Sequence, residues 1–148
     1  MKVALVGLYD RGVLDKERVH FRATSDLDLS FFLVLDSTYV GPTTIQPWNR
    51  FGYWFPPQAV KTGENVVLYT RTGKNSTETR TEGVYHFLFR HLKNPQYADA
   101  NACAVIIEVT TWVTTPQVVA PPPPPPPPPL PPSPLGLGGS LFSGLKPK

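Results

Sequence analysis

The sequence predicts an all-β domain over residues 1–115, followed by a disordered, proline-rich tail over residues 116–148. Short apolar or alternating segments recur along the first part, and turn-forming residues separate them. Fourteen of the 19 prolines lie from Pro116 onward, so the first part has the composition of an ordinary globular core. About six to eight strands at this spacing are typical of a β-sandwich or a β-barrel.

Three strands are expected in the N-terminal third of this domain. Lys2–Tyr9 is a short apolar run, and its length favours a strand over a helix. In Glu17–Thr24 apolar residues alternate with arginine and histidine, which is the period of a strand with one buried face. Leu29–Leu35 is apolar at nearly every position, and we therefore expect a central strand there.

The remaining strands are expected between clear breaks. Phe51–Phe55 is rich in aromatic residues and ends at two prolines, which favours a short strand packed on the core. Asn65–Thr70 is β-branched and aromatic and follows a predicted turn. Val84–Arg90 and Ala104–Trp112 supply two more strands, whereas Arg71–Gly83 is polar and is expected to be a loop.

Large apolar side chains in these strands predict the core. The expected core positions are Phe21, Leu33, Phe55, Val67, Leu68 and Ile106. Neighbouring residues of a strand point to opposite faces, so the alternation leaves open which of Val67 and Leu68 faces the core.

Charge and cysteine content restrict the class of protein. Residues 1–115 hold 12 basic and 11 acidic residues, whereas electrostatic binding of nucleic acid needs a basic excess on one face. Cys103 is the only cysteine, which excludes an intrachain disulfide. We see neither a normal signal peptide nor an apolar stretch of about 18 residues, and we therefore expect a soluble, cytoplasmic protein.

No pattern of catalytic, cofactor-binding or metal-binding residues stands out. His20 and His86 occupy alternating strand positions, whereas zinc needs three or four converging ligands. Asp26 and Asp28 fit a turn better than a calcium site, which needs six or more oxygen ligands. Cys103 begins an apolar strand and is expected to be an inert core residue. We therefore expect a non-enzymatic protein without a cofactor or a metal.

One group of basic and aromatic residues keeps a second function open. Its members are Arg71, Lys74, Arg80 and Arg90, near Tyr69, Tyr85 and Phe89. Such a group suits single-stranded nucleic acid, whose bases stack on aromatic rings. Glu78 and Glu82 dilute the positive charge, so we favour a solvated loop beside a core strand.

Two segments together resemble a known family. The first is Glu17–Leu33, with Ser25–Ser30 at its centre, and the second is Tyr53–Pro57 followed by Val60–Leu68. A strand, then D-L-S, then an aromatic F-P, then K-x-G-E-x-V-x-L is similar to the lamin tail domain. The resemblance implies an antiparallel, immunoglobulin-like β-sandwich that acts as a non-catalytic interaction module. Residues 71–101 are longer and more aromatic than the corresponding region of that family.

The tail contains an unbroken run of prolines from Pro121 to Pro129, which must form a polyproline II rod. Modules that place prolines between aromatic rings recognise this preformed shape. The candidate docking positions are Pro121, Pro129, Leu130, Pro131 and Pro132. We favour a stiff spacer over a docking segment, because length and stiffness alone explain the run.

The sequence as a whole favours a binding or structural module with a protein partner, and a nucleic-acid-binding β domain is the alternative. It identifies neither that partner nor the oligomeric state.

Overall fold

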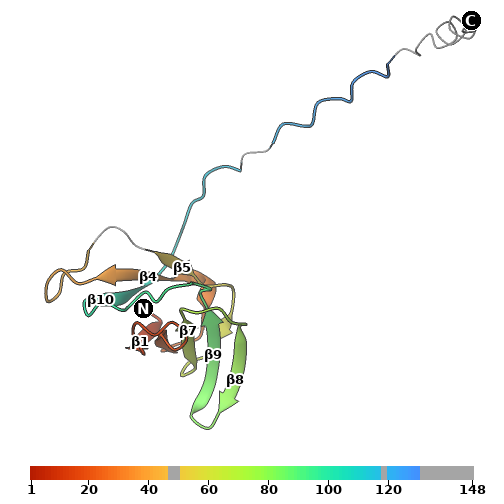
Figure 1. The fold of residues 1–148 in the computed structure, drawn as a ribbon. Helices are drawn as coiled ribbons and strands as arrows, with labels where there is room; N and C mark the ends of the chain where they lie inside the picture. Colours follow the sequence, from red (N-terminus) through yellow and green to blue (C-terminus); the bar gives the residue numbers. More distant parts are fainter. Residues whose placement is uncertain (47–50, 118–119, 131–148) are drawn as a thin grey trace, which may run out of the picture. The chain divides into compact units, whose positions relative to one another are not determined.

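The computed structural model describes residues 1–46, 51–117 and 120–130 (Figure 1). The chain divides into two units, Met1–Val113 and Thr114–Lys148. All strands of the described residues lie in the first unit, which is therefore all-β, as the sequence predicts. In the second unit, residues 114–117 and 120–130 are exposed and form neither helix nor strand.

The larger sheet of the first unit has five strands in the order β1-β2-β7-β9-β8. These strands are β1 (Val3–Tyr9), β2 (Arg18–Ala23), β7 (Asn65–Tyr69), β9 (Gly83–Phe89) and β8 (Ser76–Arg80). β7 and β9 pair in parallel, and the other neighbours are antiparallel. The expectation of a wholly antiparallel fold is therefore wrong for one pair. The β8–β9 hairpin folds back so that β9, and not β8, lies beside β7.

Strand β8 lies within the segment that the sequence predicts to be a loop. All five of its residues are exposed, so no alternation of apolar and polar side chains marks it. Its backbone pairs with β9 along its whole length, and Gly83 begins β9 with a φ of 126° that favours glycine. The ladder with β9, which a polar sequence does not reveal, makes this segment a strand.

A second sheet has three antiparallel strands in the order β10-β4-β5 (Figure 1). These are β10 (Ala102–Glu108), β4 (Phe32–Thr38) and β5 (Gly52–Trp54). A short pair joins β3 (Leu27–Asp28) to β6 (Ala59–Val60).

The start of β4 differs from the expectation. The sequence predicts a strand from Leu29, whereas Leu29–Phe31 forms a 3-10 turn, η1. Asp28 caps this turn, because its Oδ1 accepts a hydrogen bond from the Ser30 backbone N–H at 2.8 Å. The strand therefore begins only at Phe32.

One core contains side chains from both larger sheets. Its buried members include Val19, Phe21, Val66, Leu68 and Leu88 from the five-stranded sheet, and Phe32, Val34 and Ala102 from the three-stranded sheet. Phe21 meets Phe55 edge to face, with ring centroids 6.1 Å apart. The predictions for Phe21, Phe55 and Leu68 are confirmed, and Ile106 packs against the same core.

The open choice between Val67 and Leu68 is decided by the structure: Val66 and Leu68 take the inner face of β7, and Val67 is buried in a separate cluster with Phe87 and Phe89. Two other predicted core residues lie on an outer face instead. Leu33 and Cys103 are half-buried and lie on the face opposite to the buried Phe32, Val34 and Ala102. Because β4 begins at Phe32, the alternation places Leu33 outward.

Two buried carboxylates join the loops to the sheets. Glu17 is fully buried and accepts hydrogen bonds from the Thr70 hydroxyl and from the backbone N–H groups of Gly12, Gln96 and Tyr97. Asp36 accepts hydrogen bonds at 2.5 Å from the Tyr97 hydroxyl and from Arg90 Nη1. Burial, and then the Asp36 charge, raise the pKa of Tyr97 far above its usual range. The segment around Tyr97 is therefore fixed without belonging to a strand.

Candidate interaction surfaces

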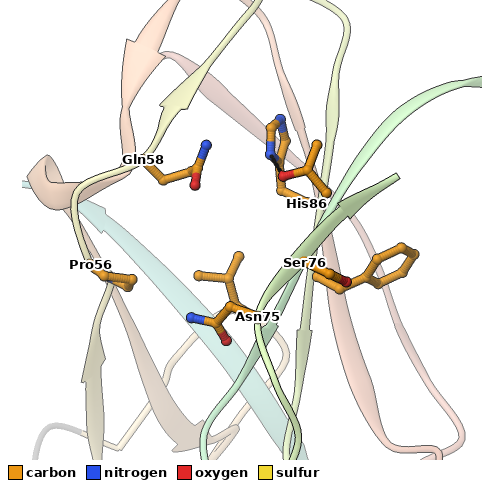
Figure 2. A pocket seen from close by; sticks show the side chains of 8 residues that line it. Pro56, Gln58, Asn75, Ser76 and His86 are labelled. Carbon is orange, nitrogen blue, oxygen red and sulfur yellow. Dashed lines mark hydrogen bonds between the residues drawn. The ribbon is translucent and has the colours of Figure 1, made fainter. Parts of the chain in front are cut away.

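A polar hollow of about 250 Å³ lies beside β8 and β9 (Figure 2). Its lining residues are Pro56, Gln58, Asn75, Ser76, Thr77, His86, Phe87 and Leu88. Figure 2 shows Pro56 and Gln58 on one side, with Asn75, Ser76 and His86 across the hollow from them. The backbone of the segment before β6 therefore faces the β8–β9 hairpin.

A chain of hydrogen bonds passes through His86 at the edge of this hollow. His86 Nε2 lies 2.7 Å from Glu64 Oε2, and His86 Nδ1 lies 3.0 Å from the Thr77 hydroxyl. The bond from His86, and then the Lys61 backbone N–H, lower the pKa of Glu64. Glu64 is therefore a carboxylate that accepts from the Nε2–H of His86.

The order hydroxyl, imidazole, carboxylate is that of a nucleophile activated by a base. Among the described residues, His86 is the only titratable one that lines the hollow itself, and its carboxylate partner Glu64 lies outside that lining. In residues 1–46, 51–117 and 120–130, no cluster of three His, Cys, Asp or Glu residues could hold a metal ion. The two hydrogen bonds of His86 connect β8, β9 and the turn before β7.

The sequence gives no sign of this chain of hydrogen bonds, because its members are far apart and Thr77 lies in a predicted loop. The neighbouring turn, in contrast, is as expected. Asp26 accepts hydrogen bonds from the Thr62 backbone N–H at 2.9 Å and from Lys61 Nζ at 3.0 Å. The interpretation of Asp26 and Asp28 as residues that cap backbone groups is confirmed.

The outer face of the five-stranded sheet carries stacked aromatic rings covered by arginine, which we call the aromatic–arginine face. Its members are Tyr9, Arg18, His20, Tyr69, Arg71, Arg80, Tyr85, Phe87 and Phe89. The rings of Tyr69 and Phe89 are nearly parallel, at 13°, with centroids 5.4 Å apart. The Tyr85 and Phe87 rings lie at 12° and 6.1 Å.

Two arginines lie over these rings. The Arg71 guanidinium carbon is 5.1 Å from the centroids of both Tyr69 and Phe89. Arg80 lies 4.9 Å from the Phe87 centroid and also forms an ion pair with Glu78 at 2.7 Å. The structure thus brings together most of the basic and aromatic group that the sequence singled out. There are two exceptions: Arg90 pairs with buried Asp36, and Lys74 lies exposed before β8 and has no ring contact among those described.

The outer face of the three-stranded sheet is apolar, and we call it the outer apolar face. From β4, β5 and β10 it presents Leu33, Leu35, Trp54, Cys103, Val105 and Ile107. Phe31 and Trp112 adjoin it, and the Trp112 ring centroid lies 5.6 Å from that of Trp54 and 6.0 Å from that of Phe31. Trp54 is 46% exposed, Trp112 51% and Ile107 38%.

The proline run is only partly described. Pro121, Pro129 and Leu130 are exposed, Leu130 by 90%, whereas Pro131 and Pro132 lie outside the described residues. The docking hypothesis for the tail therefore stays a prediction.

No protein-family model matches this chain, and no curated protein matches it either. The resemblance to the lamin tail domain stays an expectation. Within the described ranges, none of the helices has the length and apolarity required to cross a bilayer.

Proposed function

We propose that this protein is a non-enzymatic binding module for another protein, with the proline-rich tail as a spacer or docking segment. The observation that carries the proposal is the outer apolar face. Six side chains from three adjacent strands gather there, and none of them is charged. Exposed apolar patches on soluble proteins commonly mark interaction sites.

The sequence of β4 supports a cover on this face. The first four residues of β4, Phe32–Leu35, are all apolar, and an unbroken apolar run is typical of strands covered on both faces. The inner residues Phe32 and Val34 are buried in the core, whereas Leu33 and Leu35 on the other side are only half-buried. A partner that covers the outer apolar face would complete the burial that this pattern predicts.

A substitution on this face tests the proposal. Ile107→Lys places a charge on the outer apolar face, and Ala4→Lys places the same charge at an exposed position of β1. In affinity capture followed by mass spectrometry, we expect Ile107→Lys to lose the captured protein and Ala4→Lys to keep it. Equal capture by both variants would refute a role for this face.

The tail is tested by a separate exchange. Replacing Pro121–Pro129 with a glycine-serine linker removes the polyproline II shape but keeps the chain length. If the run is a spacer, the exchange removes only its stiffness, so we expect residues 1–115 still to capture the partner. Loss of a partner in this variant alone would instead identify the run as a ligand.

The aromatic–arginine face supports a second candidate function, the binding of single-stranded nucleic acid. Arginine and stacked rings together are the groups that such sites use. Two acidic residues counter the charge, because Asp10 pairs with Arg18 and Glu78 pairs with Arg80. In titrations with a labelled homopolymer, three phosphate contacts would give a salt slope of about −2. Binding that Arg80→Gln leaves unchanged would count against this site.

A further inference from the structure

We propose that the outer apolar face is a homodimer interface, on which a second copy of this chain packs the same face. The inference rests on the proposed function and specifies its partner. The resulting contact would be a β-sheet packed on a β-sheet around a two-fold axis, with the two layers about 10 Å apart.

The charges on the face favour a partner with the same surface. The centre of the face is aliphatic, with Leu33 opposite Ile107 and Leu35 opposite Val105. A partner that brought a charged group to these six side chains would bury it unpaired, because none of the described residues of the face carries a counter-charge. The described face of a second copy brings uncharged side chains, and an isologous contact is complementary to itself by symmetry.

Backbone hydrogen bonding also favours a sheet over an extended peptide. A polyproline segment has no internal hydrogen bonds, so its carbonyl groups need donors from water or from the site. Trp54 donates its Nε1–H to the Ser30 carbonyl at 2.5 Å, so its indole N–H is already used. The strands of a second copy arrive with the central backbone paired in their own ladder.

The size of the face predicts a weak dimer. Phe31, Trp54 and Trp112 are each about half exposed, and full burial of an aromatic side chain removes about 150–250 Å². The three rings therefore contribute roughly 300 Å² per copy, and the half-buried aliphatic residues add roughly 100–150 Å². About 900 Å² over both copies is below the range of stable complexes, so association should depend on concentration.

Sedimentation velocity over a wide concentration range tests this with the full chain. We expect the mass to rise from 16.4 kDa toward twice that value. Val105→Lys should stay monomeric, and Ala4→Lys should associate like the natural chain. Ile107→Ser is a milder second variant, whose side chain is already partly exposed, and its association should weaken at least tenfold. Circular dichroism melts identify any variant that fails to fold.

Cross-linking locates the interface. Cys103 is the only cysteine, so Cys103→Ala provides a background for single cysteines at chosen positions. With a short bismaleimide, Val105→Cys should form a covalent dimer and Ala4→Cys should not.

A chain that stays monomeric at every concentration would overturn the dimer. A dimer that survives in both Val105→Lys and Ile107→Ser, or that cross-links through position 4 alone, would do so as well. The proposed function has a separate test. If the chain stays monomeric but captures a different protein through Ile107, the dimer is overturned and the binding role stands; equal capture by Ile107→Lys and Ala4→Lys refutes the binding role.

Discussion

Replacing Glu17 with glutamine should destabilise the fold more than its conservative chemistry suggests. Glu17 is fully buried, and Glu17→Gln keeps the shape of the side chain but removes its charge. Oε1 accepts from the Thr70 hydroxyl and the Gln96 N–H, both at 2.7 Å. Oε2 accepts from the Gly12 N–H at 2.8 Å and from the Tyr97 N–H at 3.0 Å.

The magnitude follows from these four donors. A glutamine amide has one acceptor oxygen, so its NH2 group must replace one of the two carboxylate oxygens. If it replaces Oε1, the Thr70 hydroxyl can turn to accept, but the Gln96 N–H loses its acceptor. Leaving the Gln96 N–H without an acceptor costs about 1–3 kcal/mol of stability. The three other hydrogen bonds each become weaker by about 1 kcal/mol, because their partner is no longer charged. Relief from burying a charge offsets about 1–3 kcal/mol, which leaves a net loss of about 1–5 kcal/mol.

Urea unfolding at low protein concentration measures this loss, with tryptophan fluorescence as the signal. At a slope of about 2 kcal/mol per molar urea, the midpoint should fall by about 0.5–2.5 M. The matched control is Glu78→Gln, an exposed residue that pairs with Arg80, which should change the stability by less than about 0.5 kcal/mol. Equal midpoints for Glu17→Gln and Glu78→Gln would refute the assigned role of the buried carboxylate.

Three further predictions concern the core, the tail and one carboxyl group. Leu68→Ala should cost about 2–5 kcal/mol in urea unfolding, and Leu33→Ala less than half of that, because only Leu68 is in the core; equal losses would contradict the assigned faces. Deletion after Thr115 should leave the melting temperature almost unchanged, because the tail buries little apolar area, and a large loss of cooperativity would oppose this. Hydrogen bonds from the Thr62 backbone N–H, and then from Lys61, lower the pKa of Asp26 from 3.8 to about 2. Its contribution to stability is therefore full above pH 3.8 and lost as the pH falls through about 2, and a carboxyl midpoint near 3.8 by NMR would contradict it.

Several elements could be predicted because their signals are local. The alternation in Arg18–Ala23 and the β-branched residues of Asn65–Tyr69 mark strands β2 and β7 wherever these strands lie in the sheet. The turn at Asp26 is likewise local, since short polar side chains bond to nearby backbone groups. Strand β8 has no such signal, because all five of its side chains are exposed and only the backbone hydrogen bonds with β9 make it a strand.

The candidate surfaces were foreseeable only in part. Arg71 and Arg80 are close in sequence to the aromatic residues that they cover, so that group could be suggested from the chain alone. The bonds that join Glu64, Thr77 and His86 depend on the parallel pairing of β7 with β9 and on the hairpin beside it. No local pattern encodes that pairing.

The sequence by itself determined that this chain forms β-strands, where most of them lie and that a proline-rich segment follows them. Only the tertiary structure decided which side of each strand is covered. Alternation has the same period on both faces, so it cannot distinguish the inward Phe32 and Val34 from the outward Leu33 and Leu35. The 3-10 turn capped by Asp28 and the register with β10 set that choice, and they leave an uncharged sheet face exposed.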